Sequence, residues 1–147
     1  MSLKKFLLIL PILILSSCSG KDESQKNILN EKDVELQMID AYEKGKEALD
    51  EGDVLYAAKM FMEAALLFPQ SDWAPRSSLM VAYSYYSRSY YGDAVFELER
   101  FLKVYPTHPS QDYAHYLLAL CYYETIIDER KDLEPLKKAK EKFEYVI

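Results

Sequence analysis

The sequence predicts an all-α fold, a helical solenoid of about three helix pairs preceded by a signal peptide. Three observations carry this prediction. Apolar residues recur at spacings of three and four from about residue 34 onward, as they do on one face of a helix. The helical segments repeat with a period of 37 residues. A short apolar leader ends in two serines that are followed by Cys18.

The leader, residues 1–17, has the order of parts typical of a bacterial lipoprotein signal peptide. Two lysines come first, an apolar run of ten residues follows, and two serines stand directly before Cys18. As a helix this run spans about 15 Å, half of a hydrocarbon core, so we expect no transmembrane helix there. The end of the leader resembles a lipobox, which implies that Cys18 carries lipid and begins the mature protein. The alternative is an ordinary signal peptide with a chance cysteine.

Residues 18–33 follow as the lipidated cysteine and a polar, flexible tether. Ser19 stands where inner-membrane lipoproteins tend to carry Asp, and this resemblance favours the outer membrane. Removing the leader and its two lysines leaves 130 residues with 24 acidic and 16 basic side chains, enough for one domain. This acidic balance argues against nucleic acid as a partner, and against an anionic membrane surface as the main partner.

Five positions define the 37-residue repeat. They are Gly45, Ala57, Phe61, Ala64 and Pro69 in the first unit, and Ala82, Ala94, Leu98, Phe101 and Pro106 in the second. A third unit starts at Ala119 and resumes after an insertion with Ala139, Phe143 and Val146. The small residues let paired helices approach closely, the bulky ones fill the space between repeats, and the proline stops the second helix. This set resembles the tetratricopeptide repeat, so residues 34–147 are predicted to form a tetratricopeptide-repeat helical solenoid.

The first two helix pairs have clear boundaries in the sequence. The first pair is expected at 34–51 and 54–68, because a glycine stops the first helix and Asp53 can cap the second. The second pair is expected at 73–89, where a proline lies in the first turn, and at 92–104.

The third pair is expected at 111–128, capped by Ser110, and in a helix that Pro135 opens at about residue 135. The sequence stops inside this last helix, without the polar cap that ends a repeat array. We therefore interpret the third repeat as truncated. The chain is then either a fragment of a longer array or a short protein whose open end is covered by a partner.

No catalytic or metal motif accompanies the repeats. The sequence contains no P-loop, zinc-protease helix, nucleophile elbow or paired-cysteine motif, so we expect no enzyme, no metal and no cofactor. With Cys18 lipidated, Cys121 has no disulfide partner and is expected in the apolar core. His108 lies in a Pro-Thr-His-Pro turn and is interpreted as a loop or capping residue, whereas His115 is expected to be exposed. Four carboxylates are expected on solvated helix faces: Glu97, Glu99, Glu141 and Glu144.

Tyrosines provide the better functional lead. In the repeat register, Tyr85 and Tyr122 fall on the packing side of their helices. The concave side receives a candidate peptide-binding set: Tyr42, Lys46, Arg76, Tyr83, Tyr86, Tyr113, Tyr116 and Tyr123, with Leu49, Leu79 and Leu120 between them. Tyrosines offer a large apolar area with a polar tip, and the two cations could bind a carboxylate, which suits an extended peptide with aromatic side chains. A role in filling gaps between helices is the equally weighted alternative.

Several stretches make the chain similar to a known family. They are AYSYY at 82–86, ELERFL at 97–102, YPTHP at 105–109, DYAHYLLAL at 112–120 and LLALCYYETIID at 117–128. They resemble the BamD (ComL) family of outer-membrane assembly lipoproteins, and the similarity covers roughly residues 38–147. The turn followed by Asp-Tyr is the most specific of these features, because ordinary tetratricopeptide repeats lack it.

This resemblance implies a non-enzymatic scaffold and receptor of the β-barrel assembly machinery, lipid-anchored in the outer membrane and facing the periplasm. Its expected partners are the barrel-forming core subunit, other assembly lipoproteins and unfolded outer-membrane protein clients, recognised through an aromatic-rich C-terminal signal. In the family, later repeats make much of the contact to the core subunit. Two alternatives stay open. One is another tetratricopeptide-repeat envelope lipoprotein, an adaptor for cell division or peptidoglycan, and the other is the helical-repeat part of a longer lipoprotein enzyme.

Overall fold

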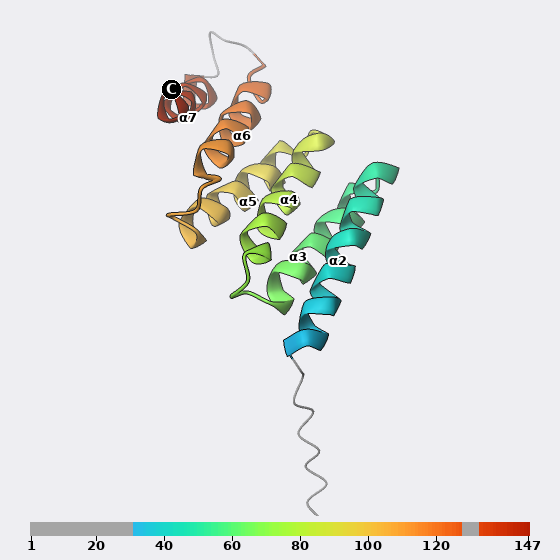
Figure 1. The fold of residues 1–147 in the computed structure, drawn as a ribbon. Helices are drawn as coiled ribbons and strands as arrows, with labels where there is room; N and C mark the ends of the chain where they lie inside the picture. Colours follow the sequence, from blue (N-terminus) through green and yellow to red (C-terminus); the bar gives the residue numbers. More distant parts are fainter. Residues whose placement is uncertain (1–30, 128–132) are drawn as a thin grey trace, which may run out of the picture.

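Helices follow one another in pairs in the computed structural model, which describes residues 31–127 and 133–147 (Figure 1). The leader, Cys18, the tether before residue 31 and the insertion at 128–132 lie outside the described residues. The described helices are α2 (Glu31–Glu51), α3 (Val54–Leu67), α4 (Trp73–Ser87), α5 (Tyr91–Val104), α6 (Gln111–Glu124) and α7 (Leu133–Val146). The all-helical fold predicted from the sequence is therefore confirmed.

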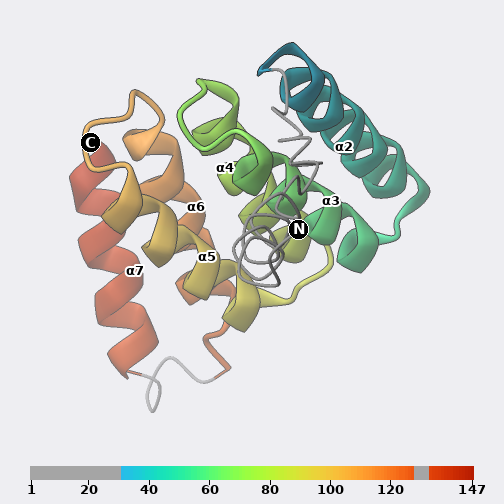
Figure 2. The same ribbon diagram turned by 90° about the horizontal axis from the view of Figure 1, so that it is seen from below.

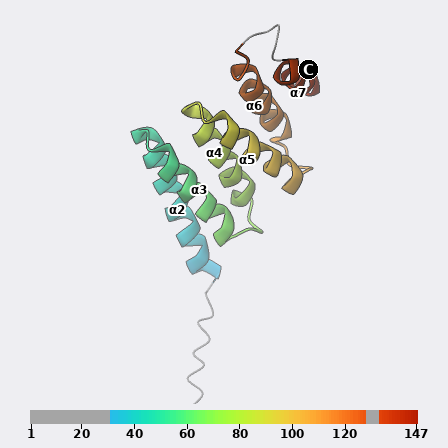
Figure 3. The same ribbon diagram turned by 180° about the vertical axis from the view of Figure 1, so that it is seen from behind.

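Each helix from α3 to α6 packs against the helix before it and the helix after it in the chain, and α2 and α7 pack against their single described neighbours. The views from below and from behind show the same stepwise order from α2 to α7 (Figure 2; Figure 3). Besides these neighbours, α4 touches α6, the first helix of the next pair. Such sequential packing is the arrangement of a tetratricopeptide-like solenoid, as the 37-residue period predicts.

Small residues let the first pair approach closely. A Cβ added to Gly45 on α2 would stand 2.8 Å from the ring of Phe61 on α3, so only glycine fits there. Phe61 is fully buried together with Ala57 and Ala58 and packs against Val81 of α4. The glycine and alanines of the repeat pattern thus mark the contacts that join one helix to the next.

The second and third pairs share a larger apolar cluster. Leu98 and Phe101 of α5 pack there against Leu117, Leu118 and Cys121 of α6, and all five side chains are buried. Burial raises the pKa of the Cys121 thiol to about 12. Cys121 is therefore a core residue, as predicted, and its thiolate is strongly disfavoured.

Helix ends agree with the sequence at Asp53 but not at Ser110. The Oδ1 atom of Asp53 accepts a hydrogen bond from the amide of Tyr56 at 3.1 Å and caps α3. Ser110 stands at the corresponding position of α6, but its side chain makes no capping bond, and its φ and ψ of −86° and 15° are not those of a typical N-cap. Its amide instead donates to Nδ1 of His108 at 3.1 Å, which confirms the predicted turn role of that histidine.

Three helices end earlier than predicted, and the first of them, α3, stops at Leu67 rather than residue 68. α4 stops at Ser87 because the amides of Ser89 and Tyr90 turn back onto carbonyls of the last turn, and Ser89 takes a positive φ of 63°. α6 stops at Glu124, and the hydroxyl of Thr125 donates to the Tyr122 carbonyl at 2.7 Å.

Helix starts also differ from the prediction. α2 begins at Glu31 rather than residue 34, α5 at Tyr91 rather than residue 92, and α7 at Leu133 rather than residue 135. Pro135 therefore lies within the first turn of α7, where its missing amide costs nothing.

Two polar residues lie in places that the sequence did not predict. Glu97 is buried, not solvated, and its Oε2 accepts a hydrogen bond at 2.7 Å from Nε of Arg100 one turn later. This ion pair compensates a charge that would otherwise be costly to bury. His115 is half-buried, not exposed, because the ring of Tyr145 on α7 stacks on it with the ring centroids 3.7 Å apart.

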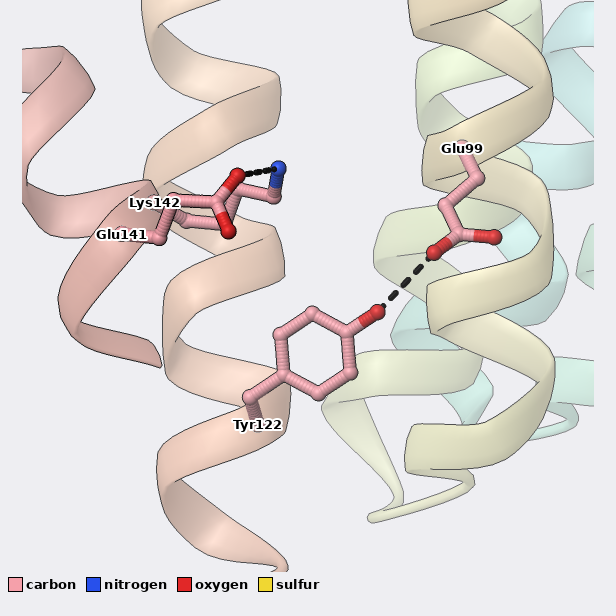
Figure 4. A network of polar contacts seen from close by, with 4 residues as sticks. All are labelled: Glu99, Tyr122, Glu141 and Lys142. Atoms are coloured by element: carbon pink, nitrogen blue, oxygen red, sulfur yellow. Dashed lines mark hydrogen bonds and ion pairs between the residues drawn. The ribbon is translucent and has the colours of Figure 1, made fainter. Parts of the chain in front are cut away.

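Tyr122 joins the last three helices from the packing side, as predicted for this residue and for Tyr85. Its hydroxyl donates to Oε1 of Glu99 on α5 at 2.9 Å (Figure 4). On α7, Nζ of Lys138 lies 5.3 Å from the centre of its ring. Burial and the Glu99 carboxylate raise the pKa of Tyr122 to about 12, so the hydroxyl stays protonated and can donate. Glu141 is exposed and pairs with Lys142 at 2.7 Å (Figure 4).

Candidate functional site

A hollow of about 390 Å³ opens where α2, α4 and the start of α6 face one another. It is lined by Tyr42, Arg76, Leu79, Met80, Tyr83, Ser110 and Tyr113. Four of the eight predicted binding residues thus meet in one place, and they come from all three repeats. The hollow is mostly apolar, with hydroxyl groups and one guanidinium as its polar features.

Arg76 is the charged residue of this hollow. It lies in the first turn of α4, and its guanidinium carbon stands 5.7 Å from the centre of the Trp73 ring. No acidic side chain among residues 31–127 and 133–147 forms an ion pair with it. In a chain of net charge −6, an exposed cation without a carboxylate partner is available to a ligand.

The wall contributed by Tyr42 is held rigidly. Its ring makes edge-on contacts with Phe61 and Trp73, with centroids 5.2 and 5.1 Å apart. Tyr42 is therefore a packing residue that also lines the hollow. Edge-on aromatic contacts fix the ring, and a fixed wall lowers the entropy lost when a ligand binds.

Tyr83 and Tyr113 form the more open part of the hollow. Their side chains are 37% and 42% exposed, respectively. Burial raises the pKa of Tyr113, and the neighbouring hydroxyls of Tyr83, Tyr86 and Tyr116 add to this effect. Tyr83 and Tyr113 thus line the hollow together with Arg76.

The remaining predicted residues lie outside the hollow. Tyr86 is half-buried, and its ring centroid is 6.0 Å from that of Tyr91. Tyr116 is exposed beside Phe143 of α7, with centroids 6.3 Å apart. Tyr123 lines a second hollow of about 290 Å³, together with Glu124, Ile126, Ile127 and Leu136. Lys46 lines neither of these hollows and pairs with Glu43 at 3.1 Å.

Two residues that line the hollow were not predicted from the sequence as binding residues. Met80 follows the helical spacing of Arg76 and Tyr83, so the register on α4 could have revealed it. Ser110 lies in the turn before α6, and no periodic signal marks it.

Two features are absent from the described residues, 31–127 and 133–147. There, no group of three or more histidine, cysteine or acidic side chains is placed to hold a metal ion. None of the helices in these ranges has the length and apolarity needed to cross a membrane.

The fold and this face define the class of protein, a tetratricopeptide-like helical-repeat protein with an aromatic inner surface. Comparison with known families gives the particular group. The model of the YfiO family, described as outer membrane lipoprotein, matches residues 34–147. The chain belongs to this family.

Individual relatives agree with this assignment. The chain is 35% identical over 125 residues to the outer membrane protein assembly factor BamD of Caulobacter vibrioides, covering 85% of this chain and 40% of that protein. It is 32% identical over 135 residues to the protein of the same name from Rickettsia prowazekii, covering 92% and 51%. For the Neisseria gonorrhoeae protein of that name the identity is 30% over 122 residues, covering 82% and 45%.

The chain therefore spans about half, or less, of the length of the curated relatives it matches. Membership of a lipoprotein family whose relatives are named assembly factors confirms the predicted family resemblance. It also confirms the prediction that the chain is not an enzyme.

Proposed function

We propose that this chain is a lipid-anchored scaffold and client receptor of the β-barrel assembly machinery, which takes part in inserting β-barrel proteins into the outer membrane. The names of its relatives support the assembly role. The leader and Cys18 support attachment to the membrane through lipid. Two or more acyl chains on that cysteine would give stable anchoring, and the chain would face the periplasm from the outer membrane.

The hollow around Arg76 is the observation that carries the receptor role. It combines an unpaired guanidinium with three tyrosine rings and two apolar side chains, within about 390 Å³. A guanidinium binds a carboxylate with two parallel hydrogen bonds, and aromatic walls accept an apolar or aromatic ring. An extended peptide that carries both groups, such as the end of an unfolded outer-membrane protein, therefore fits this surface.

The proposed partners are the barrel-forming core subunit, other assembly lipoproteins and unfolded clients. We propose client binding in the described repeats, because the residues that line the hollow belong to them. Contact with the core subunit is part of the same proposal, which rests on the match of the family model to residues 34–147 of this chain and on the names of its relatives.

Site-specific crosslinking tests this function. A photoreactive residue in place of Tyr83 should capture unfolded outer-membrane proteins in a membrane preparation. The same residue in place of Phe96, which is 66% exposed on the outer face of α5, is the matched control and should capture none of them. Equal capture from both positions, or capture of cell-wall enzymes from Tyr83, would contradict the proposal and favour a different envelope adaptor.

Peptide binding measurements distinguish the contribution of the ligand's carboxylate from that of its aromatic ring. For a peptide with a C-terminal aromatic residue, Arg76→Ala should weaken binding of the free acid about tenfold, the loss expected for one charge-assisted pair. The same peptide with an amidated end should bind both proteins equally. A similar loss for the amide would show that Arg76 only supports the fold.

A further inference from the structure

The exposed face of α3 carries a stripe of three apolar side chains and one lysine, and of these Met62 also packs against the core. Leu55, Lys59, Met62 and Leu66 follow one another at spacings of four, three and four residues, and we call them the α3 stripe. These spacings place all four side chains on one side of a helix, in the pattern of a coiled-coil seam. The opposite side of α3 is occupied by the buried residues Ala57, Phe61 and Ala64.

This stripe is open to solvent at both ends. Leu55 is 58% exposed and Leu66 is 68% exposed, whereas the core residues of the same helix are almost fully buried. A shallow hollow of about 360 Å³ runs along the second half of α3, lined by Lys59, Met62, Glu63, Leu66 and Leu67. Two exposed leucines lie on one face of this 14-residue helix. Burying their apolar area against a partner would stabilise the complex.

Two opposite charges lie near the middle of the α3 stripe, one in it and one beside it. Lys59 and Glu63 are both exposed and stand one helical turn apart, close to the middle of α3. In the two described ranges, neither forms an ion pair within 4 Å. A face with a cation on one side of its midpoint and an anion on the other matches an inverted copy of itself.

We propose that the α3 stripe is a self-association surface, on which α3 of a second copy packs antiparallel about a two-fold axis near residue 61. This arrangement puts Leu55 against Leu66 of the second copy at both ends of the seam. In the middle, Lys59 covers Met62 of the second copy and reaches its Glu63. Such an isologous pairing closes on itself and gives a dimer rather than a filament.

The expected dimer is weak, because one pair of short helices buries less than about 1,200 Å² in total, the lower limit for stable interfaces. We expect a dissociation constant on the order of 100 µM in solution. Confining two lipid-anchored copies to one membrane would raise their effective concentration, so the contact would matter most there.

Sedimentation equilibrium of the full chain in a density-matched detergent tests the surface. The dimer fraction should rise with protein concentration, and Leu66→Glu should lower the association constant at least about tenfold while the circular dichroism spectrum stays unchanged. Phe96→Glu alters an equally exposed residue on α5 and is the matched control. A chain that stays monomeric up to millimolar concentration, or a dimer that Phe96→Glu disrupts equally, would overturn the proposal.

Charge reversal tests the antiparallel pairing. Lys59→Glu alone and Glu63→Lys alone place like charges opposite each other twice in the dimer, and each should weaken association about fivefold or more. The double variant restores opposite charges and should associate within about twofold of the original chain. If both single variants and the double variant associate equally, the charges play no part and the register is wrong.

Disulfide trapping tests the register independently. In chains that carry Cys18→Ser, the buried Cys121 is unreactive, so an introduced cysteine is the reacting thiol. Oxidising a mixture of Leu55→Cys and Leu66→Cys chains should give a covalent heterodimer, whereas either variant alone should stay monomeric. Crosslinking of Leu55→Cys with itself would indicate a parallel pairing and overturn the proposed arrangement, as would trapping of an unrelated protein in place of the second copy.

Discussion

The first and the last helix pair follow the same repeat pattern but are joined in different ways. α3 has seven buried residues, whereas Ala139 is the buried residue of α7. The α2–α3 contact is built from alanines, Gly45 and a fully buried Phe61. The α6–α7 contact is instead made by half-exposed rings and by Lys138 on Tyr122.

This difference shows that a repeat pattern determines where helices lie, but not how strongly they adhere. In a solenoid each repeat contacts only its neighbours, so stability is a sum of local terms. Apolar burial contributes more per contact than exposed aromatic or charged pairs. We therefore expect α2–α3 to be the stable end of the described solenoid and α7 to open first.

The largest effect should come from Phe61→Ala in the first pair. Removing a fully buried ring from between α2, α3 and α4 leaves a cavity, and such changes cost about 3–5 kcal/mol of unfolding free energy. Urea unfolding followed by circular dichroism measures the loss. Phe96→Ala removes the same ring from an exposed position on α5 and should change stability by less than about 0.5 kcal/mol. Similar losses in both variants would show that the first pair is not held by this core.

The next largest change in stability is expected from Gly45→Ala, with Gly92→Ala as its control. The Cβ of Gly45→Ala would stand 2.8 Å from the Phe61 ring, so α2 and α3 must separate, at a cost of about 1–3 kcal/mol. Gly92→Ala adds the same methyl group on α5, where nothing lies within 4 Å, and should stabilise the protein by up to about 1 kcal/mol. The prediction fails if the two thermal midpoints shift in the same direction.

Gly45 and Phe61 also show how much of the fold could be predicted from the sequence. The 37-residue period predicted close helix approach at Gly45 and a space-filling role between repeats for Phe61. The Phe61 ring does pack against Val81 of the next pair, and it also lies against Gly45 within its own pair, a contact that the period did not predict. The period also brought Tyr42, Arg76, Tyr83 and Tyr113 to one hollow, since corresponding positions of successive repeats share a face.

Tertiary contacts decided the features that the sequence missed. Glu97 is buried because it pairs with Arg100 and because other helices pack around it. His115 is half-buried because the ring of Tyr145, 30 positions later in the chain, covers it. Ser110 failed as a cap because the turn set its backbone angles, and Lys46 paired with Glu43 rather than joining Arg76. Periodicity carries no information about such contacts.

A smaller and more local effect is expected from Tyr145→Ala in the last pair. The variant loses the ring that stacks on His115, a contact worth about 0.5–1.5 kcal/mol. Amide hydrogen exchange should therefore accelerate in α7 while the amides of α3 in the same molecule, the internal control, keep their rates. Faster exchange throughout the chain would mean that α7 and α3 unfold as one unit, contrary to the comparison.

The smallest effect is a dependence of α7 docking on pH, and His115 sets its direction. Burial and the nearby Lys142 lower the pKa of His115 below its ordinary value of 6.5, although Asp112 and Glu141 act in the opposite sense. The Nδ1 atom is buried without a hydrogen-bond partner among the described residues, so a proton placed there gains no acceptor. The unfolded or undocked state then binds the proton more tightly than the docked one, and stability is lost as the pH falls below about 6.5 towards the lowered pKa.

Exchange in α7, corrected for its intrinsic pH dependence, should therefore show less protection at pH 5.5 than at pH 7.5. His115→Gln should remove this difference, whereas α3 should show none in either protein, and a pH response that survives the substitution would assign it to another group.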